Sequence, residues 1–243
     1  MAEKNDYVNR ELSWIEFNYR VLSEARDKST PLFDRLKFLS ITASNLDEFY
    51  MVRVASLKDM VHAKYAKKDI AGLTAKEQLD KISEKTHQLV DLQYSTYNRM
   101  LLPQLRANGL NFVEHHEQLT ERQAQYVDEY FEENVYPVLT PMAVDSSHPF
   151  PFLASKSLNI AMLLEKNERD EEMDEENDID VKTAIVPVPS VLPRIIRLPD
   201  VSEANSRHCF VFLEDMLMFY AARFFVGYDL LEARAFRITR DAD

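Results

Sequence analysis

Glycine is scarce in this sequence, and its scarcity limits how the chain can turn and how it can bind phosphate. Only three glycines occur in 243 residues, Gly72, Gly109 and Gly227, against an average usage of about 7%. They are widely separated, so the sequence contains neither a G-x-G-x-x-G turn nor a G-x-x-x-x-G-K-[ST] loop. Any nucleotide bound by this chain must therefore be held by side chains or by helix ends.

The chain up to about Arg26 has the pattern of an amphipathic helix. Ser13 and Glu16 form a capping-box pair, and Leu12 and Phe17 stand at the positions of a hydrophobic staple. Apolar residues then recur at helical spacing. The pattern predicts a helix that begins at Ser13.

Three further helices are predicted before Gly109. Pro31 lies in the first turn of one that reaches about Ile41. The apolar pattern breaks over residues 42–45, and Asn45 is predicted to cap a new helix that continues to about Tyr65. Thr74 and Glu77 then form a capping box for a long helix, which Gly109 follows as a C-terminal cap. Four such helices imply an antiparallel bundle.

The second half of the sequence has a different hydrophobic pattern. Thr120 and Gln123 open one more helix, to about Tyr136, after which prolines separate short apolar runs. The predicted strands and one late helix are Leu158–Leu164, Ala184–Val188, Arg194–Leu198, Cys209–Leu213, the helix Glu214–Phe225, and Ala233–Thr239. We therefore expect a mixed fold: an all-α antiparallel helical bundle over residues 1–108, followed over residues 109–243 by an α+β head domain truncated at its C-terminal end.

The net charge of −12 is unevenly spread. Residues 165–180 contain ten acidic side chains against Lys166 and Arg169, a net charge of −8. This composition is typical of a solvated loop, and an acidic metal site is the less favoured interpretation. Residues 1–74 carry a net charge of +1, so the overall charge does not exclude a phosphate-rich partner.

The compartment is predicted from what the sequence lacks. Cys209 is the single cysteine, which excludes an internal disulfide and a cysteine-built zinc site, and it lies in an apolar run typical of a buried thiol. Residues 1–9 are polar, and the longest apolar stretch, Met216–Tyr228, contains Arg223 and is too short to span a bilayer. We expect a cytoplasmic protein.

No catalytic group or metal site stands out. His62 and His87 have no second ligand at helical spacing, and His115 and His116 are adjacent residues of a polar loop, so all four are interpreted as structural or solvated. A structural role is also favoured for His148, which is followed by two prolines that fix the backbone. The adjacent carboxylates of residues 47 and 48 point in different directions on a helix, so we interpret them as first-turn acids that complement the helix dipole.

Asn45 is the candidate binding residue. A capping role explains it equally well from the residues alone. Its side-chain amide, however, offers both a donor and an acceptor, as an adenine edge requires. Arg53 and Lys37 would add positive charge for phosphates to the same face.

Several long segments resemble the polyphosphate kinase family that works through a phosphohistidine. They are spread in order over nearly the whole chain: 9–14 (NRELSW), 17–22, 31–39, 44–54 (SNLDEFYMVRV), 139–141 (LTP), 148–153 (HPFPFL) and 236–242 (FRITRDA). The resemblance implies an N-terminal helical domain and part of a head domain of a much longer enzyme. That enzyme reversibly transfers the terminal phosphate of ATP to inorganic polyphosphate, with ATP and ADP as substrates and magnesium assisting.

The resemblance assigns little chemistry to this chain. In the family an asparagine of the helical domain contacts the adenine base, and Asn45 occupies that motif position. The head domain packs against the partner's helical domain in a homodimer. The catalytic histidines and the magnesium-binding residues belong to the C-terminal domains, so none is carried over, and His148 is not the phosphohistidine. We expect no nucleic-acid partner, and peripheral membrane association of the longer protein stays open.

An alternative comes from a different class of protein. The chain could be a free-standing helical interaction module that keeps the fold without a nucleotide role. A coding sequence that continues beyond Asp243, rich in arginine and histidine, would favour the enzyme segment, whereas a stop codon would favour the module.

Overall fold

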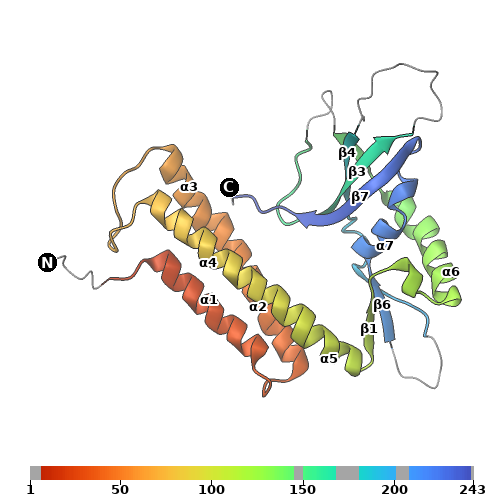
Figure 1. Cartoon of the computed structure of the whole chain (residues 1–243), viewed down its shortest axis with the longest axis horizontal. Helices are drawn as coiled ribbons and strands as arrows, with labels where there is room; N and C mark the ends of the chain where they lie inside the picture. Colours follow the sequence, from red (N-terminus) through yellow and green to blue (C-terminus); the bar gives the residue numbers. More distant parts are fainter. Residues whose placement is uncertain (1–6, 145–149, 168–180, 201–207, 242–243) are drawn as a thin grey trace. The chain divides into compact units, whose positions relative to one another are not determined.

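The computed structural model describes residues 7–144, 150–167, 181–200 and 208–241. It forms two compact units, one of Met1–Asn108 with Thr239–Asp243 and the other of Gly109–Ile238 (Figure 1). The expected order, a helical region followed by a mixed α/β region, is confirmed. His148 and most of the acidic segment 165–180 lie outside the described residues.

The helical unit is a bundle of long helices that run alongside one another (Figure 1). Its elements are α1 (Arg10–Arg26), α2 (Leu32–Phe49), a π-helical turn (Tyr50–Val54), α3 (Ala55–His62), α4 (Ala75–Thr96), a second π-helical turn (Tyr97–Leu101) and α5 (Leu102–Ala107). Ile15, Leu22, Ile82 and Leu89 are almost fully buried between the helices. The apolar helix faces predicted by the periodicity therefore form the core of the helical unit.

The predicted break at residues 42–45 is wrong. α2 continues to Phe49 and passes through the π-helical turn into α3. The polar side chains at the expected break find partners without leaving the helix, since the Thr42 hydroxyl donates to the carbonyl of Phe38 at 2.8 Å. Asn45 consequently lies inside α2 and is not an N-terminal cap.

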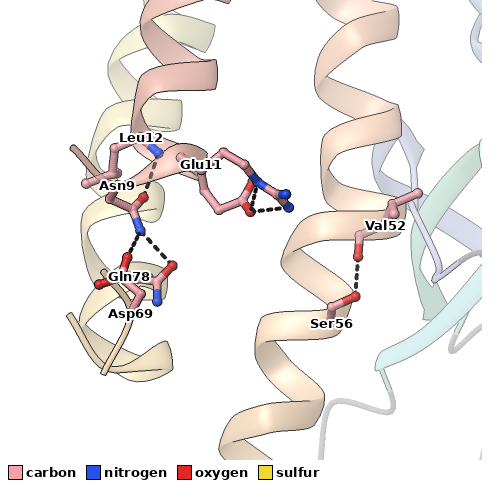
Figure 2. A network of polar contacts seen from close by, with 8 residues as sticks. Asn9, Glu11, Leu12, Val52, Ser56, Asp69 and Gln78 are labelled. Carbon is pink, nitrogen blue, oxygen red and sulfur yellow. Dashed lines mark hydrogen bonds and ion pairs between the residues drawn. The ribbon is translucent and has the colours of Figure 1, made fainter. Parts of the chain in front are cut away.

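The predicted cap of α1 is also wrong. Asn9 caps this helix, with its Oδ1 accepting from the backbone N–H of Leu12 at 2.8 Å (Figure 2). The Asn9 Nδ2 donates to Asp69 Oδ2 at 2.7 Å and to Gln78 Oε1 at 2.8 Å, so one buried amide links α1 to the loop before α4 and to α4 itself (Figure 2). The exposed Ser13 hydroxyl makes no comparable contacts among the described residues.

Two other predicted caps are confirmed. Thr74 and Glu77 form a capping box at α4, and Thr120 and Gln123 form one at α6 (Glu121–Tyr130). Gly109, with a φ of 82°, follows α5 in the left-handed conformation that favours glycine.

The described part of the head unit contains two sheets. Its strands are β1 (Leu110–Val113), β2 (Met142–Val144), β3 (Leu158–Lys166), β4 (Val181–Pro187), β5 (Ile195–Arg197), β6 (His208–Phe212) and β7 (Tyr228–Arg237). One sheet has the order β1-β6-β5 and the other β2-β4-β3-β7. The β1–β6 pair is parallel and the other pairs are antiparallel.

Helices close the core of the head unit. α6 is followed by a π-helical turn (Phe131–Val135) and a short 3-10 helix (Tyr136–Val138), so the helix predicted to reach Tyr136 is regular only to Tyr130. α7 (Leu213–Phe219) ends before the predicted Phe225, and β7 begins five residues before the predicted Ala233. Phe131, Leu213 and Leu217 are completely buried in this core.

The hydrogen bonds of Asn9 predict a large effect of its removal. Asn9→Ala deletes the helix cap and leaves the acceptors of Asp69 and Gln78 without their donor, so we expect a loss of about 2–3 kcal/mol in unfolding free energy. Urea denaturation followed by circular dichroism at 222 nm measures it. Ser13→Ala, the matched control, should change stability by less than about 0.5 kcal/mol; a larger loss in Ser13→Ala than in Asn9→Ala would contradict the assignment of the cap.

Candidate functional site

The helical unit contains a pocket of about 290 Å³ between α1, the end of α2 and the π-helical turn. The residues that line it are Trp14, Phe17, Asn45, Glu48, Phe49, Val52 and Arg53. Those from Asn45 onward follow helical spacing and form one stripe. The stripe runs from the last turns of α2 into the π-helical turn.

One wall of the pocket is aromatic. Trp14 stacks on Phe49 with ring centroids 4.4 Å apart and planes 4° from parallel. Phe49 is buried, whereas Phe17 keeps 47% of its surface exposed and lies under the guanidinium of Arg20, 5.7 Å from the ring centroid. An exposed ring beside a stacked pair offers flat apolar surface, which suits a planar ligand.

Asn45 supplies an amide to the pocket. Its Nδ2 donates to Asn18 Oδ1 at 3.1 Å, and Asn18 Nδ2 donates to the carbonyl oxygen of Thr42 at 3.0 Å. Asn18 is completely buried and Asn45 half-buried. Among the described residues, Oδ1 and the second N–H of Asn45 have no partner. The amide can therefore both accept from and donate to a ligand.

Of the two cations expected beside Asn45, Arg53 lines the pocket and Lys37 does not. Arg53 lines it, is exposed, and forms no ion pair within the described part of the chain. Lys37 does not line it and pairs instead with Asp34 at 3.2 Å, so its predicted contribution is not found. Glu48 places a carboxylate at the pocket as well.

The interpretation of Asp47 and Glu48 as first-turn acids is wrong. Both lie in the last turn of α2, because the helix begins at Leu32 rather than at residue 45. Their carboxylates therefore do not complement a helix N-terminus.

The histidines that the structure describes do not assemble a site. His87 Nδ1 lies 2.7 Å from the carbonyl oxygen of Ser83 on the same helix, and the ring of His116 meets Phe219 edge-on. Across the described ranges, no group of three or more histidine, cysteine or acidic side chains is placed to hold a metal ion. The residues of the pocket likewise do not fit magnesium, since Glu48 is the only carboxylate among them.

Asp215, in the head unit, has a carboxyl with a strongly raised pKa, which the sequence pattern did not reveal. The pKa of the Asp215 carboxyl in α7 is raised to about 7, mainly by burial and then by the negative charges of Glu214 and Glu114, against the opposing effects of His115 and Arg194. Glu214 itself accepts from Arg194 Nε at 3.0 and 3.2 Å. A perturbed carboxyl is a candidate acid or base, but Asp215 does not line the pocket at Asn45.

Comparisons with known proteins match nearly the whole chain. Residues 7–113 match the model of the polyphosphate kinase N-terminal domain, and residues 122–243 match that of the polyphosphate kinase middle domain. The polyphosphate kinase of Bacillus anthracis is 48% identical over 98% of the chain, and polyphosphate kinase 1 of Chlorobaculum tepidum is 40% identical over 100%. The chain covers 33% and 34% of these relatives, about a third of their length.

A solved structure shares the fold. The crystal structure of polyphosphate kinase from Porphyromonas gingivalis superposes with a TM-score of 0.82 at 31% identity, over 98% of this chain and 34% of that one. Among the described helices, none is long and apolar enough to cross a membrane.

The raised pKa of Asp215 predicts a pH-dependent stability. The folded state holds this proton more tightly than the unfolded state, whose pKa is near 3.8, so the stability of the wild type falls between about pH 4 and 7. Asp215→Asn removes this penalty and should stabilise the protein by about 1–2 kcal/mol at pH 8, allowing for partial solvent screening, with little effect at pH 4. Urea denaturation at both pH values checks the prediction.

The control for this prediction is the exposed Glu133→Gln, which removes one negative charge from the same unit. It should give the same small change at both pH values. A similar pH dependence in Glu133→Gln would show that net charge, and not the environment of Asp215, causes the effect.

Proposed function

Because the chain belongs to the polyphosphate kinase family, we propose that it is the N-terminal part of a longer ATP–polyphosphate phosphotransferase. That enzyme reversibly transfers the terminal phosphate of ATP to inorganic polyphosphate through a phosphohistidine. The matches to the N-terminal and middle domains, at about a third of the relatives' length, support this placement. The histidine and the magnesium ion then lie in the rest of the protein.

Within that enzyme, the pocket at Asn45 forms the adenine side of the nucleotide site. The observation that carries this proposal is the half-buried amide of Asn45, which keeps an acceptor and a donor unused beside an aromatic wall. An adenine edge needs both groups, and its ring can lie against Phe17. Arg53, at the rim, supplies a cation for the phosphates. No glycine-rich loop is needed for such a site.

Further features of the whole enzyme belong to the same proposal. The residue ranges 1–108 and 109–243 correspond to its helical domain and the first part of its head domain, and both contribute to a homodimer. The enzyme is cytoplasmic, and its association with membranes, where it occurs, is peripheral.

Substitution of Asn45 in the full-length enzyme tests the adenine contact. Asn45→Ala removes hydrogen bonds to the base, so we expect the KM for ATP to rise about tenfold while kcat falls less. Initial rates of polyphosphate synthesis over a range of ATP concentrations measure both constants. The exposed neighbour Ser44→Ala is the matched control and should leave both unchanged. An unchanged KM in Asn45→Ala would contradict the adenine contact of Asn45.

The 243-residue chain by itself should be inactive. Phosphoryl transfer needs a metal ion, cationic clamps on the transferred group and a positioned nucleophile in one site, and the family resemblance places the histidines and the magnesium-binding residues in the C-terminal domains. Incubation of the purified chain with ATP, magnesium and a polyphosphate primer should yield no polymer above background, while the full-length enzyme under the same conditions provides the positive control. Polymer formation by the chain alone would contradict the division of roles.

A further inference from the structure

The amide of Asn18 connects the interior of the helical unit to the candidate site. Asn18 is completely buried and is not among the residues that line the pocket, so it does not touch a ligand there. It forms two hydrogen bonds of opposite sense: its Nδ2 donates to the Thr42 carbonyl oxygen, and its Oδ1 accepts from Asn45 Nδ2. These bonds form a chain from the backbone of α2, through α1, to Asn45.

The direction of this chain is fixed at its inner end. A backbone carbonyl can only accept, so the Nδ2 of Asn18 must face Thr42. The Oδ1 of Asn18 then faces Asn45, and Asn45 must turn its own Nδ2 inward to donate. Rotation of the Asn45 amide by half a turn would place two acceptor oxygens against each other inside the bundle, which leaves both without a donor. The positions of Oδ1 and the second N–H of Asn45 are therefore set by Asn18.

This orientation has a consequence for the base that can bind. An unconstrained asparagine amide fits either purine, because it can exchange its donor and acceptor by rotation. Adenine carries an amino donor at C6, whereas guanine and hypoxanthine carry a carbonyl acceptor there. An Oδ1 that cannot rotate away accepts from the amino group and repels the carbonyl.

We propose that Asn18 is a positioning residue that makes the site select adenine over guanine and hypoxanthine nucleotides by locking the amide of Asn45. This inference rests on the proposed adenine contact of Asn45. A purely structural role would give Asn18 an effect on stability alone. In the proposed role, substitution of Asn18 also changes the base preference, and it does so only by changing the orientation of the Asn45 amide.

The test uses the full-length enzyme, with kcat/KM measured for ATP, GTP and ITP. A correctly oriented amide pair discriminates between bases by about 5- to 150-fold, so the wild type should prefer ATP by at least about fivefold. Asn18→Leu, which keeps side-chain volume, and Asn18→Ala should both reduce the ATP:GTP ratio about fivefold or more. Thr96→Val is the control, because it removes a buried hydroxyl of α4 that bonds Arg26 and lies outside the pocket; it should destabilise the protein without changing the ratio.

A double-mutant cycle tests whether Asn18 acts through Asn45. If it does, Asn18→Leu combined with Asn45→Ala should show the ATP:GTP ratio of Asn45→Ala alone, while the losses of thermal stability remain separate. A lower ratio in the double variant than in Asn45→Ala would overturn the proposal.

The remaining outcomes separate this inference from the proposed function. If Asn45→Ala changes the ratio and neither Asn18 variant does, the adenine contact stands and the positioning role is wrong. If Asn45→Ala leaves both the KM for ATP and the ratio unchanged, the proposed adenine contact of Asn45 itself fails. A wild-type enzyme that uses GTP as well as ATP overturns the positioning role without any variant, even if the Asn18 variants do not fold.

Discussion

The buried amide of Asn18 must form its hydrogen bonds within the contact between α1 and α2, and much of the helical unit depends on this requirement. A buried amide without partners costs about 1–3 kcal/mol. Sliding α1 along α2 by one turn would separate Asn18 from the Thr42 carbonyl and from Asn45. The apolar faces alone would tolerate such a shift more easily, because contacts between aliphatic side chains have no direction. The polar pair therefore specifies the register.

The same register builds the aromatic wall of the pocket. Trp14 lies one turn before Asn18 on α1, and Phe49 lies one turn after Asn45 on α2. In antiparallel helices these two steps lead to the same level, which is where the Trp14 and Phe49 rings stack 4.4 Å apart. The hydrogen-bonded pair and the stacked pair are thus successive layers of one interface. The pocket opens beside both layers, so its polar and apolar walls are positioned by a single helix contact.

Local sequence patterns predicted the elements well and their ends less well. The capping boxes at Thr74 and Thr120 were predicted correctly because both partners of each box are neighbours in sequence. For α1 the local pattern predicts Ser13 as the cap, since Ser-x-x-Glu is an equally good capping box. Asn9 prevails because its amide also bonds Asp69 and Gln78, 60 and 69 residues away. No local pattern contains that information.

In the site, too, some residues were predicted correctly from the sequence and others were not. Asn45 and Arg53 were predicted as binding residues and both line the pocket, whereas Lys37 was predicted and does not. The stretch from Thr42 to Asn45 resembles a helix boundary because short polar side chains compete with the backbone for hydrogen bonds. Here the Thr42 hydroxyl bonds back within the helix and Asn45 bonds Asn18 on the facing helix, so the helix continues. The partner on α1 decides the outcome, and the sequence alone does not identify it.

The scarcity of glycine, which limits the chain's turns, also affects how such a site can achieve selectivity. In a glycine-rich loop the recognition groups are backbone amides, whose direction is fixed by the fold. A site built from side chains lacks that fixed direction, because an asparagine amide can rotate and exchange its donor with its acceptor. The orientation of such an amide is fixed only if a second group is hydrogen-bonded to it. The series of hydrogen bonds must end at an atom that can only donate or only accept. In this protein the Thr42 carbonyl is that atom, and one buried asparagine links it to the pocket. The backbone of α2 thus fixes the orientation of the Asn45 amide through Asn18.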